Sequence, residues 1–118
     1  MPKILIVDDS SFMRVSIKTL LEKHGYEVIG EASNGAIGVE LYKELKPDIV
    51  TMDITMPIMT GIEAVKAIKV FDANAKIIML SAMGQEGLIR DSIIAGAKTF
   101  IVKPFKEAHF LDILKKLC

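Results

Sequence analysis

The stretch ILIVDD (residues 4–9) is a short apolar run that ends on two adjacent carboxylates, Asp8 and Asp9. Runs this short and this apolar are typical of strands that are buried on both faces of a parallel sheet. In an open parallel sheet, ligands bind beyond the carboxyl ends of the strands. The position of the two aspartates therefore indicates a site at that edge of the sheet.

Three further apolar runs also end on a chemically reactive side chain. They are IVTM (49–52) before Asp53, IIML (77–80) before Ser81 and FIV (100–102) before Lys103. Because the carboxyl ends of parallel strands meet at one edge, these side chains and the two aspartates are predicted to form one site.

Segments with helical periodicity separate the strands. Ser10 or Ser11 is expected to cap the first helix, which ends before Gly25. Pro47 ends the second helix and Gly96 closes the fourth. The apolar positions predicted for the five helices are Phe12, Val15, Leu20 and Leu21; Ile37, Val39, Leu41 and Leu45; the segment from about Ile62 to Val70; Leu88, Ile89, Ile93 and Ile94; and Ala108, Leu111, Leu114 and Leu117.

The alternation of five strands and five helices predicts an α/β fold with a doubly wound parallel sheet, because parallel neighbours require right-handed helical crossovers. The second strand, Val28-Ile29 followed by Gly30-Glu31, is the shortest and most polar, and it is therefore placed at a sheet edge. This placement favours the flavodoxin-like strand order 2-1-3-4-5. In that order, the strands that precede Asp9 and Asp53 are neighbours.

Composition limits the classes of protein. The 118 residues, 51% of them apolar, suit one domain over residues 1–118. Fifteen acidic and fifteen basic side chains cancel, so no basic field recruits nucleic acid. Every apolar run is far shorter than the ~18 residues that span a bilayer, and no signal peptide precedes the first strand, so we expect a soluble, cytoplasmic protein. The single cysteine, Cys118, cannot form an internal disulfide.

The predicted site contains the groups that phosphoryl transfer needs. Three converging carboxylates repel one another, and a divalent cation removes that conflict. Oxygen ligands suit Mg²⁺, or Mn²⁺, better than zinc. Asp53 stands alone at the end of the central strand and is the best candidate nucleophile, whereas Asp8 and Asp9 are paired metal ligands. Lys103 can hold a phosphoryl oxygen, and the Ser81 hydroxyl can donate a hydrogen bond to another.

Four motifs resemble those of two-component response-regulator receiver domains. They are ILIVDD, DIVTMDITMPIMTG (48–61), Ser81 at the end of IIML, and IVKPF (101–105). The resemblance extends from Lys3 to about Leu117. It is closest to stand-alone chemotaxis receivers of the CheY type, and the stretch SAMGQ (81–85) is similar to those outside the enteric lineage.

The resemblance implies a role for each site residue. Asp53 accepts a phosphoryl group from the phosphohistidine of a histidine kinase. Asp9 is a direct Mg²⁺ ligand, Asp8 acts mainly through water, and the backbone carbonyl of Thr55 completes the metal shell. Ser81 and Phe100 are the switch residues, and Lys103-Pro104 is a cis peptide. Phe100 replaces the usual tyrosine, while Thr55 and Met83 occupy positions that modulate the lifetime of the phosphoryl group.

The resemblance also implies a monomeric signalling switch. Such a switch is not an enzyme, except that it takes up and slowly hydrolyses its own phosphoryl group. It implies the following partners as well. The donor is a histidine kinase of the CheA type, and a dedicated phosphatase can remove the phosphoryl group. The output partner is a flagellar motor switch protein that controls flagellar rotation. It binds the face formed by the fourth helix, around Ile89, the fifth strand, and the fifth helix, around Phe110.

Other interpretations remain open from the sequence. The chain is alternatively a phosphorelay shuttle, or a receiver domain of a longer regulator. Hydrolases with an aspartyl nucleophile also use α/β sheets and Mg²⁺, but they carry an Asp-x-Asp pattern after the first strand, whereas Asp8 and Asp9 are adjacent. A flavodoxin-like cofactor carrier is disfavoured because the predicted rim lacks a glycine-rich phosphate cradle. Taken singly, Asp8-Asp9 and Ser81 suit a loop or a cap, Lys103 suits a solvated surface, and Phe100 suits a plain core.

Overall fold

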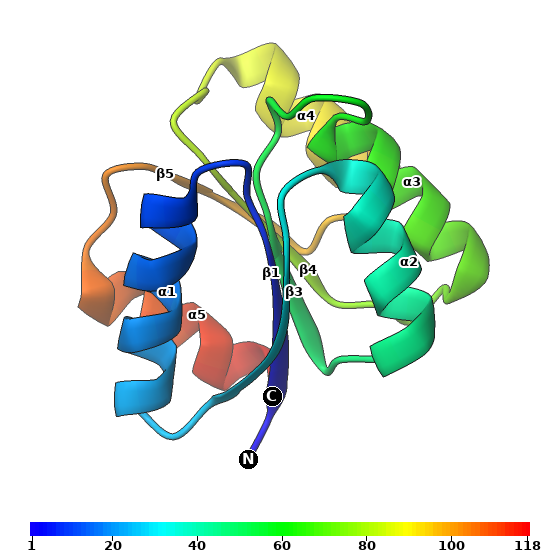
Figure 1. Cartoon of the computed structure of the whole chain (residues 1–118). Coiled ribbons are helices and arrows are strands. Elements are labelled where there is room, and N and C mark those ends of the chain that lie inside the picture. The colour runs from blue at the N-terminus through cyan, green and yellow to red at the C-terminus, as the bar shows by residue number, and fades with distance from the viewer.

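Five strands alternate with five helices in the computed structural model, which describes residues 1–118 (Figure 1). The strands are β1 (Lys3–Val7), β2 (Glu27–Ala32), β3 (Ile49–Met52), β4 (Ile77–Ser81) and β5 (Thr99–Val102). The helices are α1 (Ser11–Lys23), α2 (Gly35–Leu45), α3 (Gly61–Phe71), α4 (Glu86–Ala95) and α5 (Glu107–Leu117). All pairs of neighbouring strands are parallel, in the order β2-β1-β3-β4-β5. The predicted order and the edge position of β2 are confirmed, but β2 is not the shortest strand: with six residues it is the longest of the five.

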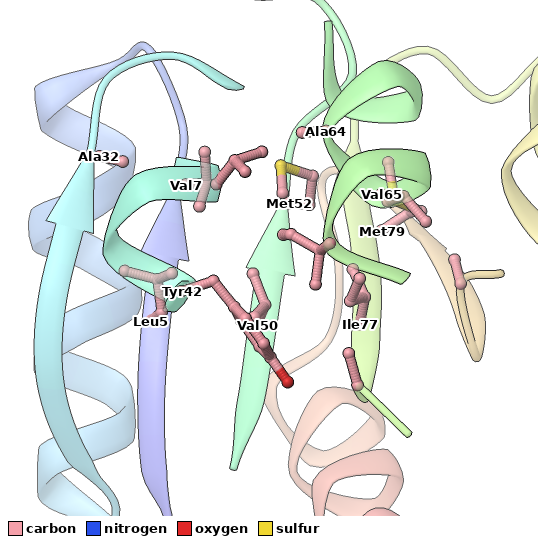
Figure 2. Close-up of a cluster of buried hydrophobic side chains, with 14 of the residues drawn as sticks. Leu5, Val7, Ala32, Tyr42, Val50, Met52, Ala64, Val65, Ile77 and Met79 are labelled. Carbon is pink, nitrogen blue, oxygen red and sulfur yellow. The ribbon is translucent and has the colours of Figure 1, made fainter. Parts of the chain in front are cut away.

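The helices cover both faces of the sheet. Figure 1 shows α1 and α5 on one face and α2, α3 and α4 on the other. Alternate residues of each strand point to opposite faces, so Leu5 and Val7 enter the cluster under α2 and α3, whereas Ile4 and Ile6 enter the cluster under α1 and α5. We call these clusters the α2–α3 core, which has sixteen buried residues, and the α1–α5 core, which has twelve. Figure 2 shows part of the α2–α3 core.

Local side-chain chemistry sets the ends of the helices. The Ser10 hydroxyl caps α1 by accepting a hydrogen bond from the Met13 N–H at 3.2 Å. Thr60 and Glu63 form a capping box at the start of α3. Gly25 and Gly96 follow α1 and α4 with φ of 88° and 121°, where a side chain would be strained. None of the five helices has the length and the hydropathy that a membrane span requires.

The predicted apolar stripe of α1 is partly wrong. Phe12 and Val15 are 75% and 62% exposed, whereas the buried residues of α1 are Ile17, Leu20 and Leu21. At roughly 100° per residue, Phe12 and Val15 lie on the side of the helix opposite this buried stripe. The stripe that faces the sheet follows the i, i+3, i+4 spacing from Ile17, and the two earlier apolar residues remain in solvent.

Four other residues that were predicted to lie on the apolar stripes of their helices are exposed to solvent. Ile37, Ile93 and Ile94 are 43%, 44% and 76% exposed, and Ala108 is exposed as well.

Phe110 is fully buried in the α1–α5 core, with its ring centroid 5.1 Å from that of Phe105. The partner face that the sequence placed around Phe110 therefore cannot include that side chain.

Candidate functional site

The acid site consists of Asp8, Asp9 and Asp53. Val7 at the end of β1 pairs with Met52 at the end of β3, so the residues that follow the two strands meet above the sheet. One carboxylate oxygen from each aspartate lies within 4.8 Å of the others. Asp8 is buried, Asp53 is half-buried and Asp9 is exposed. The structure thus brings together the three carboxylates that the strand order predicts.

Lys103 joins this cluster from the end of β5. Its Nζ lies 2.7 Å from Oδ2 of Asp8, and the two side chains are only 12% and 3% exposed. The Lys103 N–H donates a hydrogen bond to the carbonyl oxygen of Ser81 at 2.9 Å, which fixes the end of β5 against β4. Lys103-Pro104 is a cis peptide, as the family resemblance implies.

Ser81 is buried at the end of β4, and its Oγ accepts a hydrogen bond from the Met83 N–H at 3.1 Å. Phe100 lies on β5, in register with Met79, and is half-buried against the α2–α3 core. Ser81 therefore borders the acid site directly, whereas Phe100 lies farther back along the next strand.

The electrostatic environment of Asp53 disfavours an isolated negative charge. Burial raises the pKa of the Asp53 carboxyl above its ordinary value, and the Asp8 carboxylate adds to the rise. The Lys103 ammonium opposes it, as do the hydrogen bond from the Ile54 N–H and the nearby Ser81 hydroxyl. Since the rise prevails, a cation close to Asp53 would favour its charged form.

Backbone packing holds Asp53 in place. The Asp53 N–H donates to the Val7 carbonyl at 2.9 Å, and Oδ1 of Asp53 accepts from the Ile54 N–H at 2.8 Å. A Cβ at Gly61 would overlap the Asp53 carbonyl oxygen, so α3 can begin this close to the site only with glycine. The sequence indicates Gly61 merely as the boundary of a loop, because no residue pattern reveals such a close approach.

The donor set fits a hard divalent cation. Three carboxylates converge, and the Thr55 residue, which is exposed, has a carbonyl oxygen that accepts no hydrogen bond within the protein. Oxygen donors of this kind are the ligands of Mg²⁺. The three surface cavities, of about 300, 380 and 360 Å³, are all lined by other residues. The acid site is thus an open rim that suits an ion and a phosphoryl group better than a large enclosed substrate.

One further contact was not foreseen from the sequence. Arg14 on α1 donates from Nη1 to the carbonyl oxygen of Asp8 at 2.6 Å. Its Nε lies 3.2 Å from Oε1 of Glu31 on the edge strand β2. No motif indicates this interaction, because its acceptor at the acid site is a backbone atom.

Comparisons with known proteins agree with this geometry. Residues 4–115 match the response regulator receiver domain family. The chain is 58% identical to the chemotaxis protein CheY of Thermotoga maritima over 115 residues, which cover 98% of this chain and 96% of that protein. It is 60% identical to CheY of Bacillus subtilis over 114 residues, which cover 97% and 95%.

A solved structure gives the same result. A chain in the CheX–CheY–BeF₃–Mg²⁺ complex from Borrelia burgdorferi is 44% identical, with a TM-score of 0.94, and the match covers 98% of this chain and 87% of that one. CheY-type response regulators act as signalling switches of two-component systems, and chemotaxis is the pathway that the names of these relatives give. The chain belongs to the family of response regulator receiver domains and is similar to the chemotaxis proteins CheY.

Proposed function

We propose that Asp53 is the phosphoacceptor of a phosphorylation-switched response regulator. The observation that carries the proposal is the convergence of Asp53 with Asp8, Asp9 and Lys103 at one edge of the sheet. A signalling switch needs one nucleophile, a cation site and a fixed ammonium, and these residues provide all three.

In the proposed reaction, a carboxylate oxygen of Asp53 attacks the phosphorus atom of a phosphohistidine. A new P–O bond forms, the P–N bond breaks, and its electron pair returns to the imidazole of the donor. The product is an acyl phosphate on Asp53. The Ile54 N–H orients the carboxylate by binding Oδ1, so the other oxygen is the proposed attacking atom.

Asp8, Asp9, Asp53 and the backbone carbonyl of Thr55 are the groups that would hold Mg²⁺. When bound, this ion offsets the negative charge of the carboxylates and of the transferring phosphoryl oxygens. We propose that Asp9, which is exposed, ligates directly and that Asp8 acts mainly through water, because its two carboxylate oxygens already accept from the Ser10 N–H and from Lys103.

Lys103 and Ser81 are proposed to bind the phosphoryl group after transfer. The ammonium of Lys103 lies beside the site and can bind a phosphoryl oxygen as a point charge, and the Ser81 hydroxyl can donate to another. Phosphorylation adds negative charge and acceptor oxygens, so it favours the packing in which both groups bind the phosphoryl group. Phe100, half-buried on the neighbouring strand, is the proposed second switch residue.

For partners, we propose a CheA-type histidine kinase as donor and a flagellar motor switch protein as the output target. The face that changes on phosphorylation comprises α4, β5 and α5, and Ile93, Ile94 and Val102 are exposed apolar residues on the first two elements. The solved relative bound to CheX and the phosphoryl mimic BeF₃ supports a further partner, a dedicated phosphatase, that recognises the phosphorylated form. We further propose that residues 1–118 act as one monomeric receiver domain in the cytoplasm.

Incubation with acetyl phosphate and Mg²⁺, followed by intact-mass spectrometry, tests the proposed chemistry. The switch predicts one phosphoryl group per chain, lost slowly on standing. Turnover of many equivalents of a phosphomonoester would instead indicate a hydrolase.

A binding assay tests the proposed output partner. The affinity of the protein for a purified motor switch protein should rise with beryllofluoride. Transfer of the phosphoryl group to a histidine phosphotransfer protein without such a rise would favour the relay shuttle.

A further inference from the structure

We propose that Arg14 is a positioning residue, which holds the Asp8–Asp9 peptide and so sets where the Asp9 carboxylate lies in the acid site. The inference deepens the proposed function, on which it rests. It concerns a residue that does not touch the metal or the phosphoryl group.

The first observation is that Arg14 is the one protein partner of the Asp8 carbonyl oxygen. Nη1 of Arg14 donates to this oxygen at 2.6 Å, and no backbone N–H does so. The other polar atoms of Asp8 have separate partners: its N–H donates to the Ala32 carbonyl at 3.0 Å, and its carboxylate accepts from Ser10 and Lys103. Without Arg14, the carbonyl would be the single polar group of Asp8 without a partner inside the protein.

The second observation is that the Asp9 side chain makes no hydrogen bond of its own and is exposed. No side-chain contact fixes it, so its position is set by its own rotamer and by the orientation of the peptide that joins it to Asp8. Rotation of that peptide would turn the Asp8 carbonyl away from Arg14 and would move the Asp9 carboxylate relative to Asp53. By fixing the carbonyl, Arg14 restricts this rotation.

The third observation is that Arg14 contacts both ends of the segment from Asp8 to Ser10. Its backbone N–H donates to the Ser10 carbonyl at 3.0 Å, while its side chain binds the Asp8 carbonyl. The segment is thus tied at two points to one residue of α1. A metal ligand on such a short, doubly tied segment is held more rigidly than one on a free loop.

Glu31 on β2 orients the guanidinium for this role. Nε of Arg14 lies 3.2 Å from Oε1 of Glu31, and the two side chains are 19% and 34% exposed. A planar guanidinium can donate in two directions at once, which a lysine ammonium on a flexible stem does with less geometric control. Lys18 also approaches Glu31, at 3.9 Å from Oε2, but makes no contact with the acid site.

This arrangement supplies a matched control. We would compare the Mg²⁺ dissociation constants of the wild type, Arg14→Ala, Arg14→Lys and Lys18→Ala by titration calorimetry, at a temperature where each protein is fully folded. Arg14→Ala should weaken Mg²⁺ binding about 10-fold, the low end of what loss of an outer-shell contact produces. Arg14→Lys should recover only part of this loss, because it restores the charge without the planar fork. Lys18→Ala should bind as the wild type does.

The outcomes separate this inference from the proposed function. Wild-type protein that binds no Mg²⁺ would remove the metal site itself. Wild-type protein that binds Mg²⁺ and accepts a phosphoryl group, together with Arg14→Ala that binds Mg²⁺ equally well, would overturn the role of Arg14 alone. Full recovery in Arg14→Lys would also contradict it, since only the charge would then matter. If Arg14→Ala does not fold, Glu31→Leu, which removes the acceptor of the Arg14 Nε, serves instead: weaker Mg²⁺ binding than in Lys18→Ala supports the inference, and equal binding contradicts it.

Discussion

The carboxyl rim of the sheet and the two cores directly below it differ in the kind of side chain that they bury. In the cores, buried side chains are almost entirely apolar, and each strand residue packs against one face or the other. At the rim, a buried carboxylate lies beside two others, and an ammonium is buried with them. The cores lower the free energy of the fold, whereas the rim holds carboxylates that repel one another unless a cation is bound.

Each region contains one residue whose local geometry is unfavourable: a strained backbone angle at the rim and an unpaired hydroxyl in the interior. At the rim, Ile58 has φ of 71° and is the central residue of a three-residue turn in which the Met59 N–H binds the Pro57 carbonyl at 2.8 Å. A β-branched residue is strained in that conformation. In the interior, Thr51 is in register with Ile6 and Ile78 on the neighbouring strands, and its buried hydroxyl has no hydrogen-bond partner. These exceptions show where the difference between rim and interior can be tested.

Loss of the Lys103 ammonium should have the largest effect on stability. Lys103→Met leaves the Asp8 carboxylate buried without its partner, so the free energy of unfolding should fall by about 3–5 kcal/mol in EDTA. Urea unfolding measures this change. Lys116→Met is the control, because the Lys116–Asp112 pair is exposed at 75% and 59% and should contribute little. An equally small effect for both variants would mean that the Asp8 carboxylate is not destabilised when it loses the Lys103 ammonium.

Mg²⁺ should stabilise the protein through the rim. At about 100 times its dissociation constant, the ion should add about 2.7 kcal/mol by mass action and raise the melting temperature by several degrees. Thermal unfolding with and without Mg²⁺ measures the rise. Asp9→Ala should lose most of it and Asp8→Ala less. A melting temperature that Mg²⁺ leaves unchanged in wild type would contradict a metal site here.

Replacement of Thr51 should stabilise the interior. Thr51→Val keeps the shape of the side chain and removes the hydroxyl that has no partner, so the free energy of unfolding should rise by about 1 kcal/mol. Chemical unfolding detects the change, and Mg²⁺ affinity should stay constant. Destabilisation by Thr51→Val would show that the Thr51 hydroxyl does form a hydrogen bond in solution.

Relief of backbone strain should give the smallest effect. Ile58 is 83% exposed, so Ile58→Asn loses little burial and places a residue that tolerates positive φ in the turn. The free energy of unfolding should rise by only a part of the roughly 1–2 kcal/mol that the left-handed conformation costs, because asparagine relieves that cost incompletely. Ile94→Asn is the matched control, since Ile94 is 76% exposed but lies in a helix. If both substitutions change stability alike, the turn stores no strain.

The interior was largely predictable from the sequence. Short apolar runs identify buried strands because a strand covered by helices on both faces needs apolar side chains at every position, and the predicted strand Ile49–Met52 has the observed bounds. Helix stripes were less predictable. Phe12 and Val15 are apolar yet exposed, because periodicity alone does not say which apolar residues face the sheet.

At the rim, the reactive side chains were predictable from the sequence, but the contacts that hold them in position were not. Strand ends place Asp8, Asp53 and Lys103, since parallel strands all end at one edge. Arg14 and Gly61 act through backbone atoms of the acid residues, and such contacts leave no residue pattern. The positive φ of Ile58 was also hidden: Pro57 and Gly61 mark a loop, but isoleucine disfavours that conformation, so no residue pattern places it at this position.

The identity of the phosphorylated residue tests the central claim most directly. Wild type and Asp53→Asn, which keeps the side-chain volume, would be incubated with acetyl phosphate and Mg²⁺. Acyl phosphates would then be reduced with borohydride, and the modified residue located by peptide mass spectrometry. We predict modification of wild type at Asp53 alone and none in Asp53→Asn. Modification of wild type at Asp8 or Asp9, or persistent labelling of Asp53→Asn, would contradict the assignment of Asp53 as the phosphoacceptor.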